Sequence, residues 1–278
     1  MGYRASPRPT FDAPTLIRRS GAVRHIWGDD ESGFVEDWIY VSSGLIHALV
    51  FSLPPGGGFR HSPAYRTVFA ADEVLHVLQG TFVAANPEIG EVHRVEPGES
   101  LFFRRDTWHH GFARGEDEVR VLELFAPPPS RGTSGAYART RPYLEQSRYA
   151  DDSLLGALPA ERPPKRTMKV LRPTDSVWRL EGDALVGLLV STEHLTVGTL
   201  RLLPGGSSGR TSHGGDEVLF VTSGRLTVRA AWDGSEQTFT LSEEDAVYLP
   251  RGAEHEVVGA GDGPADAIFG VAPSYLPS

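Results

Sequence analysis

The sequence contains no cysteine, which excludes both a disulfide framework and a thiolate metal site. Any bound metal must therefore be held by histidine, aspartate or glutamate. A basic excess is also missing: the net charge is −9, which argues against nucleic acid or an anionic membrane as a partner, because both select basic surfaces. Lysine occurs only at positions 165 and 169 while arginine is abundant, a bias that suggests a GC-rich bacterial genome.

Long hydrophobic runs are absent as well. No segment reaches the roughly 18 consecutive apolar residues of a transmembrane helix. The first residues, MGYRASPRPTF, lack the roughly 7–15-residue apolar core of a secretory signal, so we expect a cytoplasmic protein. What the chain does have is 31 glycines and 21 prolines, which indicate many turns between short strands.

An internal repeat is the strongest positive feature. DEVLHVLQG at 72–80 returns as DEVLFVTSG at 216–224, with Glu73 and Glu217 144 positions apart. Each copy is followed by a histidine, His109 or His255, at an offset of 146 positions. A repeat of this length in 278 residues indicates a duplicated domain, because solenoid repeats are much shorter.

Strand-like segments follow each copy of the repeat. Alternating apolar residues at 81–85 and 91–95, and again at 226–231 and 237–241, flank turns rich in Gly, Asn and Asp, which is typical of hairpins. No helical pattern separates the strands, so the predicted class is all-β. We divide the chain into an N-terminal arm (1–20), a first domain (21–126), a linker (127–168) with a short helix within 143–157, and a second domain (169–278).

These motifs resemble those of bicupins, proteins with two tandem cupin barrels of the jelly-roll or double-stranded β-helix type. In that family three histidines and a glutamate point into each barrel and bind one divalent metal. The second domain carries the fuller match: His213 precedes Glu217 by four residues, Gly224 follows by seven, and Pro250, Gly252 and His255 form the second motif. The family's first histidine is replaced by Thr211. The resemblance therefore implies a metal held by His213, Glu217 and His255.

The first domain departs further from the family pattern. Glu73 and His109 fall on family positions, but Thr67 and Phe69 stand where two histidines are expected. His61 lies upstream, and an insertion after it would let its imidazole complete a set of His61, Glu73 and His109. The alternative is a barrel that has lost its metal, with His61 a loop residue. His47, on the strand before the glycine loop, is a further candidate for lining this cavity.

The resemblance leaves three functions open. The first is a non-haem iron(II) dioxygenase, because two histidines and one carboxylate leave positions open for oxygen and substrate. A redox-neutral isomerase, cyclase, decarboxylase or lyase would use the metal as a Lewis acid, with Tyr248, His110 or Glu217 itself as proton shuttle. Core packing is the alternative for Tyr248, and a packing or supporting role beside the ligands is the alternative for His110. The third is a non-enzymatic small-molecule-binding cupin. Fe(II) is the favoured cofactor, and Mn, Zn, Ni or Co would suit the same ligands. Bicupins are commonly dimers or compact monomers that mimic a dimer, which leaves a homodimer open.

Overall fold

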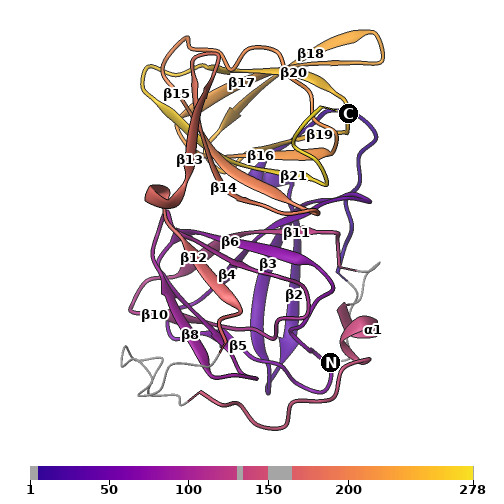
Figure 1. Ribbon diagram of the computed structural model, residues 1–278, viewed down its shortest axis with the longest axis vertical. Helices are drawn as coiled ribbons and strands as arrows, with labels where there is room; N and C mark the ends of the chain where they lie inside the picture. Colours follow the sequence, from indigo (N-terminus) through magenta and orange to yellow (C-terminus); the bar gives the residue numbers. More distant parts are fainter. Residues whose placement is uncertain (1–5, 130–133, 150–164, 278) are drawn as a thin grey trace.

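The structure is a computed structural model that describes residues 6–129, 134–149 and 165–277. Two similar β-structures follow one another along the chain and lie end to end (Figure 1). Among the described residues, no helix is long and apolar enough to span a membrane. The expected all-β class with two tandem β-domains is confirmed.

Strands β1 to β11 come before the linker. They are β1 (Thr15–Ile17), β2 (Val23–Asp29), β3 (Gly33–Ser42), β4 (His47–Leu53), β5 (Gly58–Phe59), β6 (Asp72–Gln79), β7 (Thr81–Asn86), β8 (Glu91–Val95), β9 (Ser100–Phe103), β10 (His110–Arg114) and β11 (Val119–Ala126), with the 3-10 helix η1 (Arg19–Gly21) between β1 and β2. Helix α1 (Ser134–Ala138) lies in the linker. The predicted linker helix at 143–157 is not seen in its described part, 143–149, and the rest of it lies outside the described residues.

The second half repeats this series after the linker. Its elements are β12 (Met168–Leu171), η4 (Pro173–Asp175), β13 (Val177–Glu181), β14 (Ala184–Ser191), β15 (Thr196–Leu202), β16 (Asp216–Ser223), β17 (Arg225–Trp232), β18 (Ser235–Ser242), β19 (Ala246–Leu249), β20 (Glu254–Gly259) and β21 (Ala265–Ala272).

Each half contains one seven-stranded sheet and one smaller sheet. The large sheets have the orders β12-β9-β6-β11-β4-β3-β2 and β1-β19-β16-β21-β15-β14-β13, and the small sheets the orders β5-β10-β7-β8 and β18-β17-β20. Corresponding strands of the repeat occupy corresponding places. We call β2–β12 the first barrel and β1 with β13–β21 the second barrel.

The two barrels exchange their edge strands. β1, from the predicted N-terminal arm, pairs with β19 of the second barrel, so that Thr15 lies opposite Tyr248. β12, the first strand after the linker, pairs with β9 of the first barrel. Near each of the predicted boundaries, at residues 20 and 168, there is therefore a short strand that pairs with the sheet of the other half of the chain.

The central strands of both large sheets are buried on both faces. In β6, Leu75 and Val77 point into the hydrophobic core of the first barrel, while Val74 points out of it. β16 does the same with Leu219 and Val218. The outward residues of the two sheets pack together in one inter-barrel cluster. Its members include Tyr40, Val50, Leu122 and Leu124 from the first barrel and Val197, Phe220, Tyr248 and Ile268 from the second.

Polar contacts reinforce this contact between the barrels. The guanidinium of Arg120 on β11 donates hydrogen bonds to both carboxylate oxygens of Glu244, which precedes β19. The hydroxyl of Tyr40 donates to the Glu244 carbonyl oxygen at 2.7 Å, and its ring meets Phe220 edge-on at 5.4 Å. Both side chains of the Arg120–Glu244 pair are largely buried.

We predict that Arg120→Ala lowers the free energy of unfolding by about 2 kcal/mol, because it removes two charge-assisted hydrogen bonds from a largely buried carboxylate. Arg24→Ala is the matched control: it breaks an exposed pair with Glu36 and should cost less than about 1 kcal/mol. Urea denaturation followed by fluorescence measures both. Equal losses in the two variants would contradict a role for the inter-barrel pair.

Candidate metal centres

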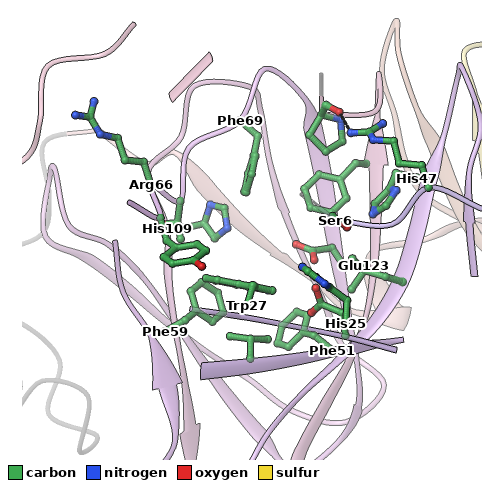
Figure 2. A pocket seen from close by; sticks show the side chains of 18 residues that line it. Ser6, His25, Trp27, His47, Phe51, Phe59, Arg66, Phe69, His109 and Glu123 are labelled. Atoms are coloured by element: carbon green, nitrogen blue, oxygen red, sulfur yellow. Dashed lines mark hydrogen bonds between the residues drawn. The ribbon is translucent and has the colours of Figure 1, made fainter. Parts of the chain in front are cut away.

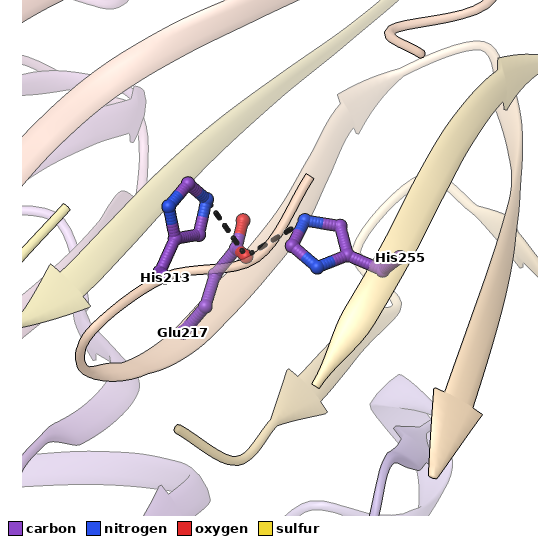
Figure 3. Close-up of side chains that lie close together, drawn as sticks. All are labelled: His213, Glu217 and His255. Atoms are coloured by element: carbon purple, nitrogen blue, oxygen red, sulfur yellow. Dashed lines mark ion pairs between the residues drawn. The ribbon is translucent and has the colours of Figure 1, made fainter. Parts of the chain in front are cut away.

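The second barrel brings together the three ligands that the sequence predicted there. The Nε2 atoms of His255 and His213 lie 3.2 Å and 3.5 Å from the same oxygen, Oε2 of Glu217 (Figure 3). Glu217 projects from β16, His255 from β20, and His213 from the loop before β16. All three side chains are buried, and Glu217 Oε2 has no hydrogen-bond partner. An unpartnered buried carboxylate oxygen facing two imidazole nitrogens fits a divalent metal between them.

Backbone carbonyl groups orient both imidazole rings. Nδ1 of His255 lies 3.1 Å from the carbonyl oxygen of Ala253, and Nδ1 of His213 lies 2.5 Å from that of Tyr275. A carbonyl oxygen can only accept, so each Nδ1 donates and Nε2 is the ring nitrogen left to face Glu217. A backbone carbonyl that holds Nδ1 in this way orients the ring of a histidine that binds a metal through Nε2.

The C-terminal segment covers one side of this set. The ring of Tyr275 stacks on His213 with centroids 4.4 Å apart, and on Phe269 at 5.4 Å. Its hydroxyl donates to the carboxylate of Glu181, and the guanidinium of Arg179 lies over its ring. Aromatic rings therefore occupy space next to the second set.

A different trio forms in the first barrel. Glu73, His109 and Glu123 each offer an atom within 4.8 Å of the others, and all three are buried. Nε2 of His109 lies 3.8 Å from Oε2 of Glu73, which has no hydrogen-bond partner. Burial lowers the pKa of His109 to about 4, so its imidazole is neutral near pH 7. This trio also fits a divalent metal, with two carboxylates in place of one.

Glu123 was missed in the sequence analysis. It lies on β11, where it pairs with Leu75 of β6, and Glu73 of β6 pairs with Phe125 two residues further along. Residues two apart on a strand share a face, so Glu123 and Glu73 both point into the barrel. The signal was available as a lone carboxylate in the otherwise apolar run LeuGluLeuPheAla at 122–126.

His61 does not join Glu73 and His109 as predicted. Its Nδ1 lies 2.6 Å from Nε2 of His110, and its Nε2 lies 2.6 Å from the carbonyl oxygen of Leu144. Both of its ring nitrogens are thus occupied outside the trio. The other ring nitrogen of His110 bonds to the hydroxyl of Tyr149. His61 and His110 therefore form a hydrogen-bonded chain that ends on Leu144 and Tyr149 of the linker. Both ring nitrogens of His110 are used in this chain, so neither contacts the trio.

Tyr248 faces away from the second set. On the paired strands β16 and β19, Glu217 lies opposite Leu249, while Val218 lies opposite Tyr248. Since neighbouring residues point to opposite faces, Tyr248 lies on the outer side of the sheet. It packs in the inter-barrel cluster and donates a hydrogen bond of 2.8 Å to Asp216. Of the predicted proton shuttles, the structure thus places Tyr248 and His110 outside the ligand sets.

The first trio borders a cavity of about 120 Å³. Figure 2 shows Glu123 between His109 on one side and His47 on the other. His47 therefore lines the cavity, as the sequence analysis suggested, and its Nδ1 is buried without a hydrogen-bond partner. Six aromatic rings contribute to the wall; they belong to Trp27, Phe51, Phe59, Tyr65, Phe69 and Phe125. The volume is comparable with that of an engineered cavity of about 150 Å³ that holds benzene.

Three buried carboxyl groups lie in or beside this cavity. Burial raises the pKa of Asp37, Glu73 and Glu123 well above the usual range, and the neighbouring acids Glu123 and Asp37 raise those of Glu73 and Glu123 further. The indole of Trp27 donates a hydrogen bond to Asp37, which opposes the shift in part. Without a cation, such groups favour the protonated form; a divalent metal would favour the ionised form.

Comparisons with known proteins agree with this geometry. The family described as the cupin domain matches residues 49–125 and 198–271, which together exceed half of the chain. The chain belongs to the cupin family. The first matched range contains Glu73 and His109, and the second contains Glu217 and His255. This cupin carries the domain twice, so it is a bicupin. A search of curated protein sequences finds no match.

Solved structures with the same fold include oxalate decarboxylases. One from Bacillus subtilis, described as having Mn(II) centres, aligns with a TM-score of 0.66 and 15% identity over 98% of this chain and 80% of its own. The oxalate decarboxylase of Lactobacillus farciminis, in a formate complex, aligns with a TM-score of 0.64 and 15% identity over 98% of this chain and 89% of its own. At this identity the likeness shows the fold alone.

We predict that Asp37→Asn stabilises the metal-free protein, and more so at pH 8 than at pH 5. The pKa of the Asp37 carboxyl is higher in the folded protein than the value of about 3.9 in the unfolded chain. The contribution of Asp37 to folding stability is therefore fully present below about pH 3.9, and it is lost as the pH rises through the folded-state pKa. The amide keeps an acceptor for Trp27 without this loss. The expected gain in melting temperature at pH 8 is about 3 °C or more.

Thermal melts in the presence of a chelator at the two pH values measure this difference. The exposed Asp30→Asn is the control and should leave the melting temperature unchanged at both. A shift for Asp37→Asn that is equal at pH 5 and pH 8 would show that the charge of Asp37 is not the cause.

Proposed function

We propose that this bicupin is a metal-dependent enzyme that converts a small organic molecule without net oxidation or reduction, and that its reaction takes place in the first barrel. The observation that carries the proposal is that Glu73, His109 and Glu123 converge beside a cavity sized for one small ring or chain. A ligand set with adjoining room for a substrate is what such chemistry requires.

The donor atoms support a redox-neutral reaction. Two carboxylates and one imidazole make an oxygen-rich set, and such sets suit Mn²⁺ or Mg²⁺ better than sets dominated by imidazole. Bound by Glu73, His109 and Glu123, the metal would supply a Lewis acid that polarises a carboxylate or carbonyl oxygen of the substrate. Decarboxylation is the first reaction to test, because the oxalate decarboxylases share this fold and one is described as having Mn(II) centres.

Side chains of the cavity can perform the remaining tasks. Loss of CO₂ leaves an electron pair on carbon that must take up a proton. Asp37 lines the cavity, and its raised pKa keeps a proton on its carboxyl group closer to neutral pH than an ordinary aspartate would. His47 can hold a substrate oxygen or nitrogen through its unpartnered Nδ1. The aromatic side chains in the wall would lower the local polarity around the reacting atoms.

The second barrel supports a second candidate, a non-haem iron(II) dioxygenase. His213, Glu217 and His255 form the two-histidine, one-carboxylate set that leaves positions open for oxygen and substrate on iron. The ring of Tyr275 on His213 lies against this set. The redox-neutral reaction would thus depend on the ligands of the first barrel and the dioxygenase reaction on those of the second. Variants of one ligand in each barrel can therefore distinguish the two candidate functions.

We predict that Glu123→Gln and His255→Ala each remove about one equivalent of metal, because each takes a charged or strongly donating ligand from one set. Elemental analysis of untagged protein, reconstituted in turn with Mn²⁺ and with Fe²⁺, measures the content. His194→Ala is the control: His194 lies in the loop before β15, outside both ligand sets. It should keep the full metal content.

The same variants are then incubated with a panel of small mono- and dicarboxylic acids and small aromatic acids, while CO₂ release and O₂ uptake are recorded in one vessel. The proposal expects CO₂ release without equivalent O₂ uptake, lost in Glu123→Gln and retained in His255→Ala. Stoichiometric O₂ uptake that is lost in His255→Ala would instead establish the dioxygenase. Metal-loaded protein that converts no compound would point to a binding protein.

A further inference from the structure

The cavity of the first barrel has a second polar end, opposite the histidine of the trio. Figure 2 shows Glu123 in the middle, with His109 on one side and His47 on the other. The side chain of His47 is buried, and its Nδ1 has no hydrogen-bond partner. Because a buried polar atom without a partner costs free energy, this nitrogen in the wall of a cavity points to a ligand group beside it.

An arginine of the N-terminal arm lies at the same end. Arg8 lines the cavity, and its positive charge acts on His47: burial, and after it the charge of Arg8, lower the pKa of His47 to about 3. The imidazole is therefore neutral near pH 7 and lies in the field of the guanidinium. A carboxylate at this end would meet a cation and a neutral ring that can donate through Nδ1.

Contacts at both ends of the first domain hold Arg8 in place. Its guanidinium donates to Oγ of Ser42, the last residue of β3, at 3.3 Å and to the carbonyl oxygen of Pro129, just after β11. The carbonyl oxygen of the next residue, Pro9, accepts from the backbone N–H of Ser42 at 2.7 Å. Further along the arm, β1 is paired with the second barrel. Arg8 is thus fixed before a ligand arrives, which lowers the entropy cost of binding.

A second arginine in the wall, Arg66, is directed elsewhere. Its Nη1 donates to the carbonyl oxygens of Ala138 and Arg141 in the linker, at 3.1 Å and 2.8 Å. Figure 2 shows its guanidinium on the side of His109, pointing away from the cavity. Arg8 is therefore the better placed of the two to bind a ligand inside the cavity.

The space between the two ends suits the apolar body of a small ligand. Aromatic side chains such as Phe51 and Phe125 contribute to the wall there, and the volume is about 120 Å³. A divalent metal on the trio would carry two positive charges, which balance the carboxylates of Glu73 and Glu123. With the metal bound, these two residues present no net negative charge to an anionic ligand.

We propose that the first barrel binds a small carboxylic acid whose carboxylate lies on Arg8 and His47, with its reacting group at the trio and its apolar body between them. The inference rests on the proposed function, because it takes the first barrel as the reactive one. Arg8 then determines specificity. It selects the ionised acid over the neutral amide of the same shape, because hydrogen bonds between two charged groups are roughly twice as strong as neutral ones.

Butyrate and butyramide test this selection, because they have the same shape and differ in charge. Saturation-transfer NMR on the full chain with added Mn²⁺ measures both dissociation constants, and we expect butyrate to bind about tenfold more tightly. Arg8→Gln should remove most of that preference. Arg8→Lys keeps the charge and should retain part of it. Arg94→Gln is the control and should change nothing, because Arg94 forms an exposed pair with Glu96 outside the cavity wall.

Three results would overturn the proposal. The unmodified protein could show no preference for butyrate. The preference could survive in Arg8→Gln, which would place the carboxylate elsewhere, for example on the metal. Both compounds could lose affinity equally in that variant, which would mean that Arg8 only holds the arm in place.

This experiment measures binding and requires no turnover, so its result is separate from the CO₂ and O₂ measurements. A preference for butyrate that depends on Arg8, together with no conversion of any compound, would support the carboxylate site and contradict the proposed reaction. Conversion by the first barrel with no effect of Arg8→Gln on the preference would do the opposite.

Discussion

The fold depends on the packing of two large sheets against each other through faces that would otherwise be exposed. In β6 and β16 the alternation of side chains sends Leu75 and Leu219 into the barrels and Val74 and Val218 into the cluster between them. Both faces of these strands must therefore be apolar, which explains why both copies of the repeat keep the Val and Leu of DEVL. The same alternation points Glu73 and Glu217 inward. A carboxylate in each barrel is thus oriented by the strand whose outer face holds the two halves together, and the exchange of β1 and β12 adds a second link.

The two ligand sets diverge within an otherwise common framework. The backbone N–H of His109 donates to the carbonyl of Thr67, and the backbone N–H of His255 donates to that of Thr211. Thr67 and Thr211 are therefore equivalent positions. Two residues further along, Phe69 stands where the second barrel has His213. On the strand β11, Glu123 stands where β21 has Phe269. The second barrel therefore has His213 and Phe269 at the two positions where the first barrel has Phe69 and Glu123. This keeps three donor groups in each barrel but moves one of them to a different strand, which changes the donor set from two imidazoles and one carboxylate to one imidazole and two carboxylates.

The sequence predicted the duplication, the all-β class and the convergence of His213, Glu217 and His255, because each depends on local alternation or on motif spacing. It could not predict the exchange of β1 and β12, because a three- or four-residue edge strand leaves no periodic pattern that names its partner. It assigned His61 to the first trio from an assumed insertion point. The loop instead carries His61 to His110 and Leu144, a result of tertiary hydrogen bonding. Glu123 was invisible to motif spacing because it lies on a strand that carries no family ligand, and Tyr248 required the register of β16 with β19.

The interiors of the two barrels also differ in how they treat polar groups. In the second barrel, Phe269 and Tyr275 stack in sequence on His213, and the carbonyl oxygen of Tyr275 takes the Nδ1 proton of that histidine. The first barrel leaves Asp37, His47 and Glu123 around a cavity, with one nitrogen of His47 and one oxygen of Glu73 unpartnered. Burying polar atoms without partners costs stability, and the same burial raises the pKa values of the carboxyl groups of Asp37, Glu73 and Glu123. A fold that only needed to pack would lose nothing by filling this space with apolar side chains, as its duplicate does around His213. The cluster of buried polar groups around this cavity is therefore the feature of the molecule that packing alone does not explain.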